Sequence, residues 1–267
     1  MVTAELANHH FLFVGGLHRS GTTIITRCLA EHPEISGFKD TGAQEDEGQF
    51  LQSVYPIGRV HGGPGAFGFA PEASLTEESP LVSVENRDQM FSGWSRHWDL
   101  GRPVLMEKSP PNIIRTRFLQ AQFPRSWFLI VVRHPVAVTF ATFTRRPKRT
   151  RVDELLRHWV HCHEILERDL PHLDRALIVP YEGFVADPDA TLGRVYDFLG
   201  LPHHPNPLPI RGETNDRYYR MWREQTSRRV AGRRTRLAAT QLEARVRRFG
   251  YSLDDLGFTG PAPSLTT

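Results

Sequence analysis

The feature that most constrains this chain is a glycine-bounded loop between an apolar run and a stretch of helical period. Residues 11–15 are typical of a buried strand, and residues 16–23 read Gly-Leu-His-Arg-Ser-Gly-Thr-Thr. The loop fits the pattern G-x-x-x-x-G, with Thr-Thr where a Walker A loop has Lys-[Ser/Thr]. Because backbone N–H groups at the start of a helix converge on anions, the unit predicts a phosphate-like ligand at residues 20–23.

The loop lacks the lysine that reaches the β- and γ-phosphates in nucleoside triphosphatases. Thr22 stands at that position, and the cation is instead Arg19, inside the loop. This exchange favours a shorter phosphate chain and no compulsory metal ion. A glycine turn that only closes a strand–helix corner is the alternative, and the flanking strand and helix disfavour it.

Farther along the chain, β-branched and aromatic runs alternate with stretches of helical period, which is typical of a parallel sheet covered by helices. We therefore predict an α/β protein with a P-loop-like three-layer fold and a central, mostly parallel sheet flanked by helices. The run at 126–132 is apolar on both faces and is expected to be a central strand. The other expected strands are 11–15, 35–38, 103–107 and 176–179. The expected helices follow the loop and lie at 110–123, 135–144, 152–170, 188–199 and, as an arginine-rich group, about 226–249.

We predict a single domain over residues 1–267, since no repeat or second domain is visible. A long irregular loop is expected at about 40–102, with its glycine-rich part at 56–80, on the acceptor side of the site. Loops of this length are uncommon in compact domains and are usually functional. The basic run 145–151 is expected to be a solvated loop and residues 260–267 a frayed tail.

Composition excludes several classes of protein. With 39% hydrophobic and 24% charged residues, the chain is an ordinary globular protein, and it has no apolar run long enough to span a membrane. The first ten residues lack the features of a secretion signal, so we expect a cytoplasmic protein without integral membrane association. Cys28 and Cys162 are expected to be small buried residues.

Charge adds a preference for anionic partners. Only three of the 33 basic residues are lysines, so planar oxyanions are plausible ligands. The 30 acidic residues nearly balance the basic ones, which argues against a nucleic-acid binder.

Three segments in this order resemble sulfotransferases that use 3′-phosphoadenosine 5′-phosphosulfate (PAPS). The first, FLFVGGLHRSGTTIITRCLAEHPEI (11–35), is similar to their 5′-phosphosulfate-binding segment, most of all in the tyrosylprotein and bacterial branches. FLIVVRHPVAV (128–138) resembles their 3′-phosphate motif, and residues 181–201 resemble the Tyr-Glu segment found downstream. The resemblance implies transfer of a sulfuryl group from PAPS to the hydroxyl of an unidentified acceptor, with release of PAP and no metal.

The resemblance also implies how the donor is bound. Arg133 would clamp the 3′-phosphate with its guanidinium, and Tyr181 would line the nucleotide site. The serine that the family has eight residues after this arginine is Ala141 here, and Thr139 or Thr142 is the nearby hydroxyl that could replace it. The 5′-phosphosulfate would lie against Arg19, Ser20, Gly21, Thr22 and Thr23.

Lys108 is the best candidate for the cation that stabilises the leaving oxygen. In MEKSP it ends an expected strand, in a setting similar to that of the catalytic lysine of the tyrosylprotein branch. Arg19 would be the second catalytic cation. The alternative for Lys108 is an ordinary exposed strand end.

The sequence does not decide which of several acids is the general base that accepts the proton of the acceptor hydroxyl. The glutamate base of the tyrosylprotein branch falls on Asp40, although Lys39 precedes it where that branch has an acid. We rank Asp46 nearly level with Asp40 and place Glu47 behind them, and His18 is a further possibility. The acids at 45–47 are otherwise favoured simply by a helix dipole.

Two other kinds of function compete with sulfuryl transfer. A P-loop kinase of small molecules or nucleotides would want a Walker lysine and a Mg²⁺-binding acid, and a non-catalytic nucleotide-binding module would not need Lys108. The acceptor, whether a small molecule, a carbohydrate or a peptide, and the oligomeric state are not specified by the sequence. Arg228 and Arg229 either reach the 3′-phosphate or, as we favour, form a solvated helix face. His158, His161 and His163 are expected to be packed or solvated rather than metal ligands.

Overall fold

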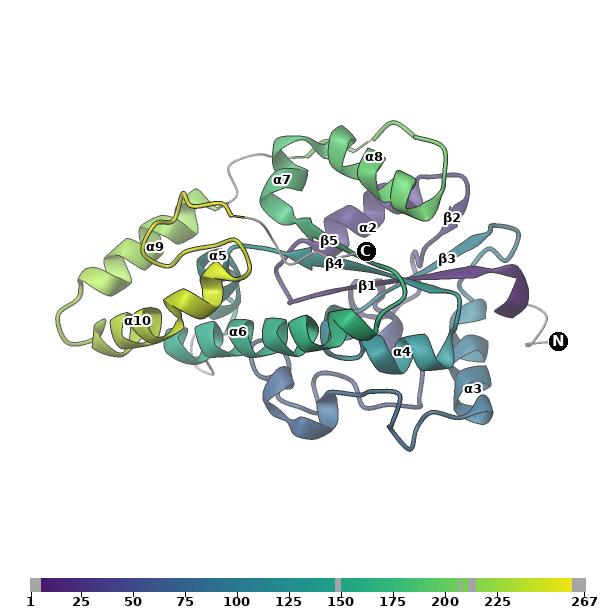
Figure 1. The fold of residues 1–267 in the computed structure, drawn as a ribbon, viewed down its shortest axis with the longest axis horizontal. Helices are drawn as coiled ribbons and strands as arrows, with labels where there is room; N and C mark the ends of the chain where they lie inside the picture. Colours follow the sequence, from purple (N-terminus) through teal and green to yellow (C-terminus); the bar gives the residue numbers. More distant parts are fainter. Residues whose placement is uncertain (1–5, 147–149, 207, 211–214, 261–267) are drawn as a thin grey trace.

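A computed structural model describes residues 6–146, 150–206, 208–210 and 215–260. Its centre is a five-stranded sheet in the order β2-β3-β1-β4-β5, with every neighbouring pair parallel (Figure 1). The strands are β1 (His10–Gly16), β2 (Ile35–Ser36), β3 (Val104–Lys108), β4 (Ser126–Val132) and β5 (Ala176–Pro180). The expected α/β class and the inner position of the strand at 126–132 are confirmed.

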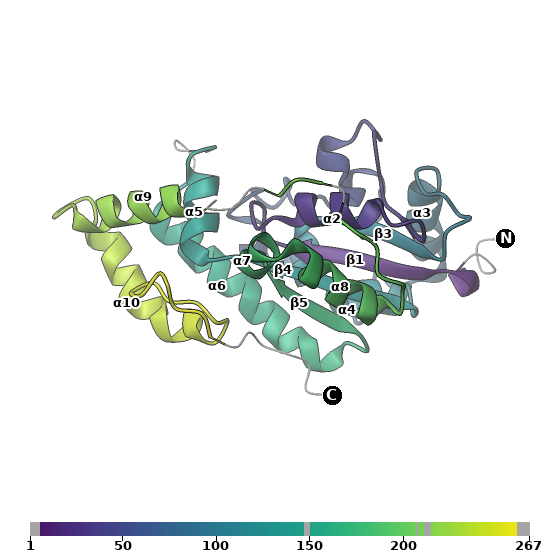
Figure 2. The same cartoon turned by 90° about the horizontal axis from the view of Figure 1, so that it is seen from above.

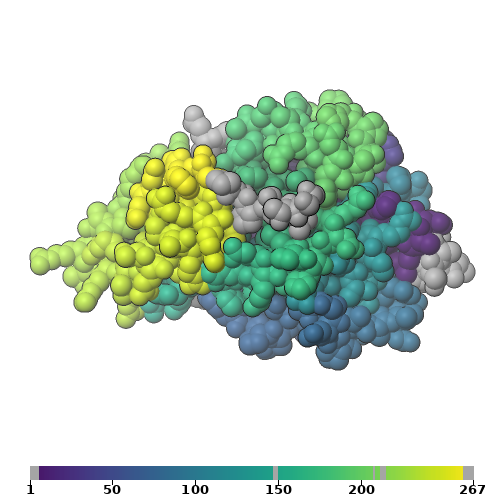
Figure 3. Space-filling model, in the orientation of Figure 1, coloured from purple at the N-terminus to yellow at the C-terminus, as the bar shows by residue number. Residues whose placement is uncertain are grey.

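Helices cover both faces of the sheet, which gives three layers. Figure 1 shows α2 (Thr22–Ala30), α7 (Tyr181–Ala186) and α8 (Pro188–Leu199) on one face. The other helices are α3 (Val84–Ser95), α4 (Thr116–Gln122), α5 (Pro135–Phe143), α6 (Val152–Asp169), α9 (Asp216–Ser227) and α10 (Arg233–Arg247). Of these, α3, α4 and α6 cover the opposite face, while α5, α9 and α10 extend past the end of the sheet at which the strands finish (Figures 1 and 2). In Figure 3, α9 and α10 form a lobe at that end of the molecule.

The protein has two clusters of buried apolar side chains, and β1 contributes to both. Successive side chains of a strand point to opposite faces, so Phe11 and Phe13 enter one apolar cluster and Leu12 and Val14 the other. All four side chains are almost completely buried. A strand buried on both faces reads as a continuous apolar run, which is why β1 and β4 are recognisable in the sequence.

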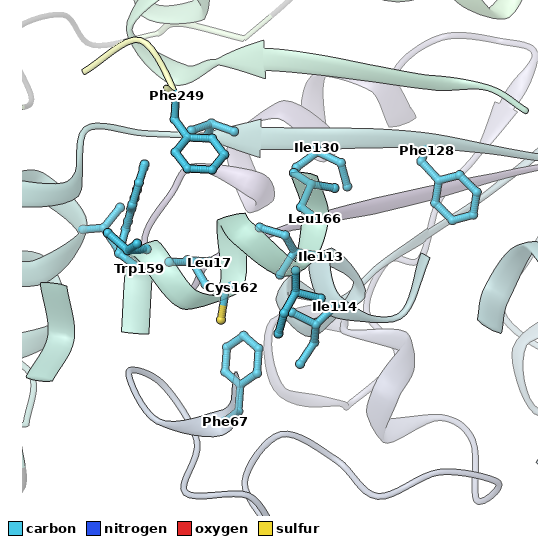
Figure 4. Close-up of a cluster of buried hydrophobic side chains, with 14 of the residues drawn as sticks. Leu17, Phe67, Ile113, Ile114, Phe128, Ile130, Trp159, Cys162, Leu166 and Phe249 are labelled. Atoms are coloured by element: carbon cyan, nitrogen blue, oxygen red, sulfur yellow. The ribbon is translucent and has the colours of Figure 1, made fainter. Parts of the chain in front are cut away.

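The glycine-rich region contributes a side chain to the larger core. Figure 4 shows the Phe67 ring directed at Cys162 of α6, with Ile113 and Ile114 on the same side of the sheet. Phe67 is completely buried. A methyl group on Gly68 would lie 2.3 Å from Cys162 Sγ, so this segment can approach α6 only without a side chain at 68.

Several expected boundaries were wrong. The stretch 40–102 is not irregular throughout, because α3 lies within it: Ser83 Oγ accepts a hydrogen bond from Asn86 N at 3.1 Å at its start, and three apolar side chains of the helix are buried. The expected helix at 110–123 is a 3₁₀ helix followed by α4. The break between them is at Arg115, whose guanidinium turns inward to donate to the carbonyls of Ala73 (3.1 Å) and Pro56 (3.0 Å).

The arginine-rich helices also differ from expectation. Helix α9 begins ten residues earlier than expected, at Asp216, and α10 begins only at Arg233. The turn between them needs Gly232, where a Cβ would lie 2.3 Å from the carbonyl oxygen of Gln225. Residues 147–149 of the basic run and 261–267 of the tail lie outside the described residues. None of the helices within the described ranges has the length and apolar character needed to cross a membrane.

Candidate active site

The register of the sheet brings the functional loops to one edge. Val14 of β1 pairs with Lys108, the last residue of β3, and Gly16 pairs with Val131 near the end of β4. The loop after β1 therefore has the end of β3 on one side and the end of β4 on the other. In open parallel sheets, ligands bind at this edge.

The loop after β1 is shaped for an anion. Gly21 has φ 103° and precedes the first turn of α2, whose N–H groups have no partners inside the helix. A Cβ at Gly21 would lie 2.2 Å from the Tyr181 ring, so only glycine fits. Ser20 Oγ is buried and has no hydrogen-bond partner in the described part of the chain. An unsatisfied buried hydroxyl at a helix N-terminus is a ready donor to a bound oxyanion.

Arg133, just after β4, is tied to this loop. Its Nη1 donates to the carbonyl oxygen of Arg19 at 2.9 Å, and its guanidinium lies over the Tyr181 ring, 4.3 Å from the centroid. Nε and Nη2 both donate to Asn215 Oδ1, at 2.9 and 2.7 Å. The side chain is 7% exposed. A buried planar cation beside an anion-binding loop suits a second phosphate group.

Lys108 lies on the other side of the loop. Its Nζ donates to the carbonyl oxygen of Glu45 at 2.7 Å, lies 3.5 Å from Thr23 Oγ1 and forms an ion pair with Glu47 at 3.6 Å. Both members of the ion pair are buried. Burial lowers the pKa of Lys108, opposed by the Glu47 carboxylate, and burial raises the pKa of Glu47, opposed by the Lys108 ammonium.

The two other candidate acids have different surroundings. Asp40 is exposed, with φ 53°, and lines a cavity of about 330 Å³ together with Thr23 and Lys108. Asp46 lines the same cavity but accepts hydrogen bonds from Thr41 N (2.9 Å) and Thr41 Oγ1 (2.7 Å). Burial would raise the pKa of Asp46, yet these hydrogen bonds outweigh it and lower the pKa overall.

Near Glu47 lies a hydrogen-bond network around Glu107, an acid that the sequence prediction missed. Gln49 Nε2 donates to Glu47 Oε2 at 2.5 Å. Gln49 N donates to Ser109 Oγ at 2.9 Å, and Ser109 Oγ donates to Glu107 at 2.6 Å. Glu107 is completely buried, and burial raises its pKa to about 7 despite hydrogen bonds from Ser109 and Asn112. The signal was an acid inside an otherwise apolar strand, since such residues are seldom buried without a role.

A second cavity, of about 430 Å³, has Glu47 in its wall. His18, Arg19 and Glu47 line it, along with Arg59, Arg145 and Arg146. Burial, followed by the charges of Arg19 and Lys108, lowers the pKa of His18 to about 3, so its imidazole is neutral at pH 7 and is a weak base. The cavity wall therefore carries four arginines and one acid.

The candidate hydroxyls Thr139 and Thr142 line cavities whose walls do not include Arg133. Thr139 Oγ1 is buried without a hydrogen-bond partner among the described residues, in a small cavity shared with His18 and His158. Thr142 lines both this cavity and the arginine-lined one. Arg228 and Arg229 are exposed beyond the far end of α9, about 18 Å along the helix from its start beside Asn215.

The helical histidines are packed against protein groups. His158 Nε2 accepts a hydrogen bond from Gly68 N at 3.1 Å, and the His163 ring stacks on Trp159 with 3.8 Å between centroids. Over the described ranges, no three His, Cys, Asp or Glu side chains come together as a metal-binding group.

Comparisons with known proteins find a matching family model and several relatives. The model of the sulfotransferase family matches residues 12–206. A protein-tyrosine sulfotransferase of Drosophila melanogaster is 23% identical over 222 residues, covering 74% of this chain and 42% of that protein. Protein-tyrosine sulfotransferase 2 of Gallus gallus is 24% identical over 198 residues, covering 71% of this chain and 51% of that protein. The chain thus spans about half the length of these curated relatives.

Two solved structures share the fold. The sulfotransferase domain from the curacin biosynthetic pathway has a TM-score of 0.51 at 18% identity, covering 88% of this chain and 97% of that one. A sulfotransferase from Alicyclobacillus acidocaldarius has a TM-score of 0.50 at 15% identity, covering 89% and 95%. The match to the family model includes most of β1 and the loop after it, together with Lys108, Arg133 and Tyr181.

Proposed function

This chain belongs to the sulfotransferase family, and from that premise we propose that it transfers a sulfuryl group from PAPS to an acceptor hydroxyl and releases PAP. One observation carries the proposal: an anion-binding loop without a Walker lysine lies between two buried cations, Lys108 and Arg133, on one sheet edge. PAPS has a matching arrangement, with a 5′-phosphosulfate and a separate 3′-phosphate.

The residues present fit this donor. Ser20 brings an unsatisfied buried hydroxyl to the loop, and the start of α2 brings free N–H groups, which together suit the 5′-phosphosulfate. Arg133, stacked on Tyr181, would hold the 3′-phosphate. Thr22 and Thr23 add hydroxyls at the first turn of the helix. When bound, PAPS supplies the activated sulfuryl group.

The protein would accelerate transfer through placement and electrostatics rather than through a covalent intermediate. Lys108 holds its ammonium beside Thr23 and would neutralise charge that develops on the leaving phosphate oxygen. Arg19 would be the second cation, because it is part of the loop and also lines the arginine-lined cavity.

Among the three acids, the geometry favours Glu47 as the proton acceptor. Glu47 is buried against Lys108 and accepts a hydrogen bond from Gln49 Nε2 at 2.5 Å, and its pKa is still raised. Asp46 accepts two hydrogen bonds from Thr41 and has a lowered pKa. A carboxylate with a raised pKa is the stronger base at neutral pH. Asp40 is the second choice, because it lines the cavity that Lys108 also lines.

Three isosteric variants test this assignment. Glu47→Gln is expected to lower turnover by about 100- to 10,000-fold with PAP affinity kept, whereas Asp40→Asn and Asp46→Asn stay within about tenfold of the parent. A large loss in Asp40→Asn with little change in Glu47→Gln would transfer the role to Asp40. Circular dichroism and melting temperature verify that each variant is folded.

The lining of the larger cavity narrows the acceptor class. Arg59, Arg145 and Arg146 surround the approach to Glu47 with positive charge. We therefore infer an acceptor whose hydroxyl lies close to a carboxylate, phosphate or sulfate, on a small molecule, a carbohydrate or a peptide. In a panel of hydroxyl compounds, anionic members are expected to take up label from PAPS, and Arg145→Ala should raise their KM. Equal transfer to neutral members would contradict this inference.

Nucleotide choice tests the function as a whole. Calorimetry should show micromolar binding of PAP that persists in EDTA, and weak binding of ATP with Mg²⁺. Arg133→Ala should weaken PAP binding by about 2 kcal/mol or more, because a charge-assisted contact is lost. Preferred binding of ATP with Mg²⁺ would instead support a kinase, and PAP binding without any transfer would support a non-catalytic module.

A further inference from the structure

The carboxylate of Glu182 joins three separate parts of the chain next to Arg133. One oxygen, Oε1, accepts hydrogen bonds from His134 N at 3.0 Å and from Asn215 Nδ2 at 2.7 Å. The other, Oε2, accepts from Tyr251 OH at 2.8 Å. These donors follow β4, precede α9 and follow α10, so a single side chain ties the sheet edge to the helical lobe.

Asn215 transmits this anchoring to Arg133. Its Nδ2 donates to Glu182, and its Oδ1 accepts from both Nε and Nη2 of Arg133, at 2.9 and 2.7 Å. Only one orientation of the amide satisfies both neighbours, since a carboxylate only accepts and a guanidinium only donates. Nδ2 also donates to Tyr219 OH, but at the longer distance of 3.3 Å, and a hydroxyl could equally donate to the amide oxygen. Glu182 is therefore the neighbour that favours the orientation in which Oδ1 faces the guanidinium.

The residues that link Glu182 to Arg133 are largely shielded from solvent. Arg133 is 7% exposed, Asn215 8% and Tyr251 5%. The Tyr181 ring supports the guanidinium from one face, and Asn215 fixes one of its edges. An arginine side chain has four rotatable bonds, and restraining them before a ligand arrives reduces the entropy lost on binding.

We propose that Glu182, acting through Asn215, is a positioning residue that sets the Arg133 guanidinium for the 3′-phosphate and so makes the site select nucleotides with that group. The inference rests on the proposed use of PAPS. It assigns a role to Glu182 that does not depend on contact with the nucleotide. Loss of Glu182 should therefore affect only ligands that carry a 3′-phosphate.

The experiment compares PAP with adenosine 5′-monophosphate, which lacks the 3′-phosphate, by calorimetry on the full chain. Glu182→Ala and Asn215→Ala are each expected to weaken PAP binding by about 10-fold or more and to change binding of the monophosphate by less than about threefold. Glu182→Gln is expected to recover most of the PAP affinity, because its amide oxygen can still accept from Asn215.

Tyr251→Phe is the matched control, since it removes a hydrogen bond to the same carboxylate on the oxygen that does not face Asn215. It should leave the ratio of the two affinities unchanged. Equal weakening of both nucleotides in Glu182→Ala, or an unchanged ratio in a folded protein, would overturn the positioning role. Failure of the parent protein to bind PAP would instead overturn the proposed function.

Discussion

Lys108 provides the sharpest test of how the site works, because its ammonium lies beside Thr23 in the first turn of α2 and has three oxygen neighbours. The nearest charged group is Glu47 Oε1, 3.6 Å from Nζ. We expect the ammonium to act on charge that appears only as the phosphate oxygen leaves. Replacing Lys108 by Ala should then slow transfer much more than it weakens nucleotide binding.

The size of the effect follows from Coulomb's law. At an effective dielectric constant of about 20, a unit charge at the distance of Glu47 contributes about 4–5 kcal/mol, and a half-developed charge about 2 kcal/mol. Lys108→Ala should therefore lower kcat by about 30- to 1,000-fold. PAP affinity should change by less than about fivefold. Lys108→Arg should restore only part of the lost kcat, because the wide, planar guanidinium does not reproduce the compact charge of an ammonium group.

The assay is single-turnover transfer of labelled sulfate from PAPS, run beside calorimetry with PAP. Lys39→Ala is the matched control, since Lys39 is exposed and lines the same cavity as Lys108. A melting temperature is needed for each variant, because removal of the ammonium leaves Glu47 buried without its partner. If Lys108→Ala weakens PAP binding as much as it slows transfer, Lys108 is a ground-state anchor and the reasoning fails.

Three further predictions concern binding, pH and stability. Gly21→Ala should cost about 1–3 kcal/mol of unfolding free energy and lower PAP affinity, as measured by denaturant unfolding and calorimetry, because φ is 103° and the methyl group would meet Tyr181. The pKa of Glu107 is raised from 4.5 to about 7, so between these pH values the folded state keeps a proton that the unfolded state loses. The free energy of unfolding should therefore fall by about 3 kcal/mol as the pH rises from 4.5 to 7. Glu107→Gln should flatten this fall in urea titrations from pH 4 to 8. Arg115→Leu should speed proteolytic cleavage at 56–80, because the carbonyls of this segment lose a buried donor, and unchanged cleavage would refute the anchoring role.

The parts of the site that could be predicted are those whose signal is local in sequence. Strand β1, its loop and the first turn of α2 are consecutive, so composition and glycine spacing were sufficient. Arg133 was predictable for the same reason, because it ends the most apolar strand of the chain. Lys108 was identified at the end of a strand, and the parallel register then brought it beside the loop.

The missed parts depend on contacts between distant segments. Glu182 forms hydrogen bonds with Asn215, 33 residues away in the sequence, and with Tyr251, 69 residues away. No sequence periodicity predicts contacts between such distant residues. Arg115 interrupts a helix because its guanidinium bonds carbonyls far away in the chain, at Ala73 and Pro56. Propensity favours a continuous helix there, and tertiary contacts override it.

The position of β1 in the sheet explains why its loop lies between the two proposed cations. Because β1 lies between β3 and β4, its loop receives Lys108 from one side and Arg133 from the other. Arg133 is joined to the loop through the carbonyl oxygen of Arg19, and Arg19 also lines the cavity that contains Glu47. Arg19 thus connects the proposed 3′-phosphate anchor with the arginine-lined cavity proposed for the acceptor. Glu182 is not among the residues that line that cavity. Damage to Glu182 should therefore impair donor selection without changing which acceptor is used.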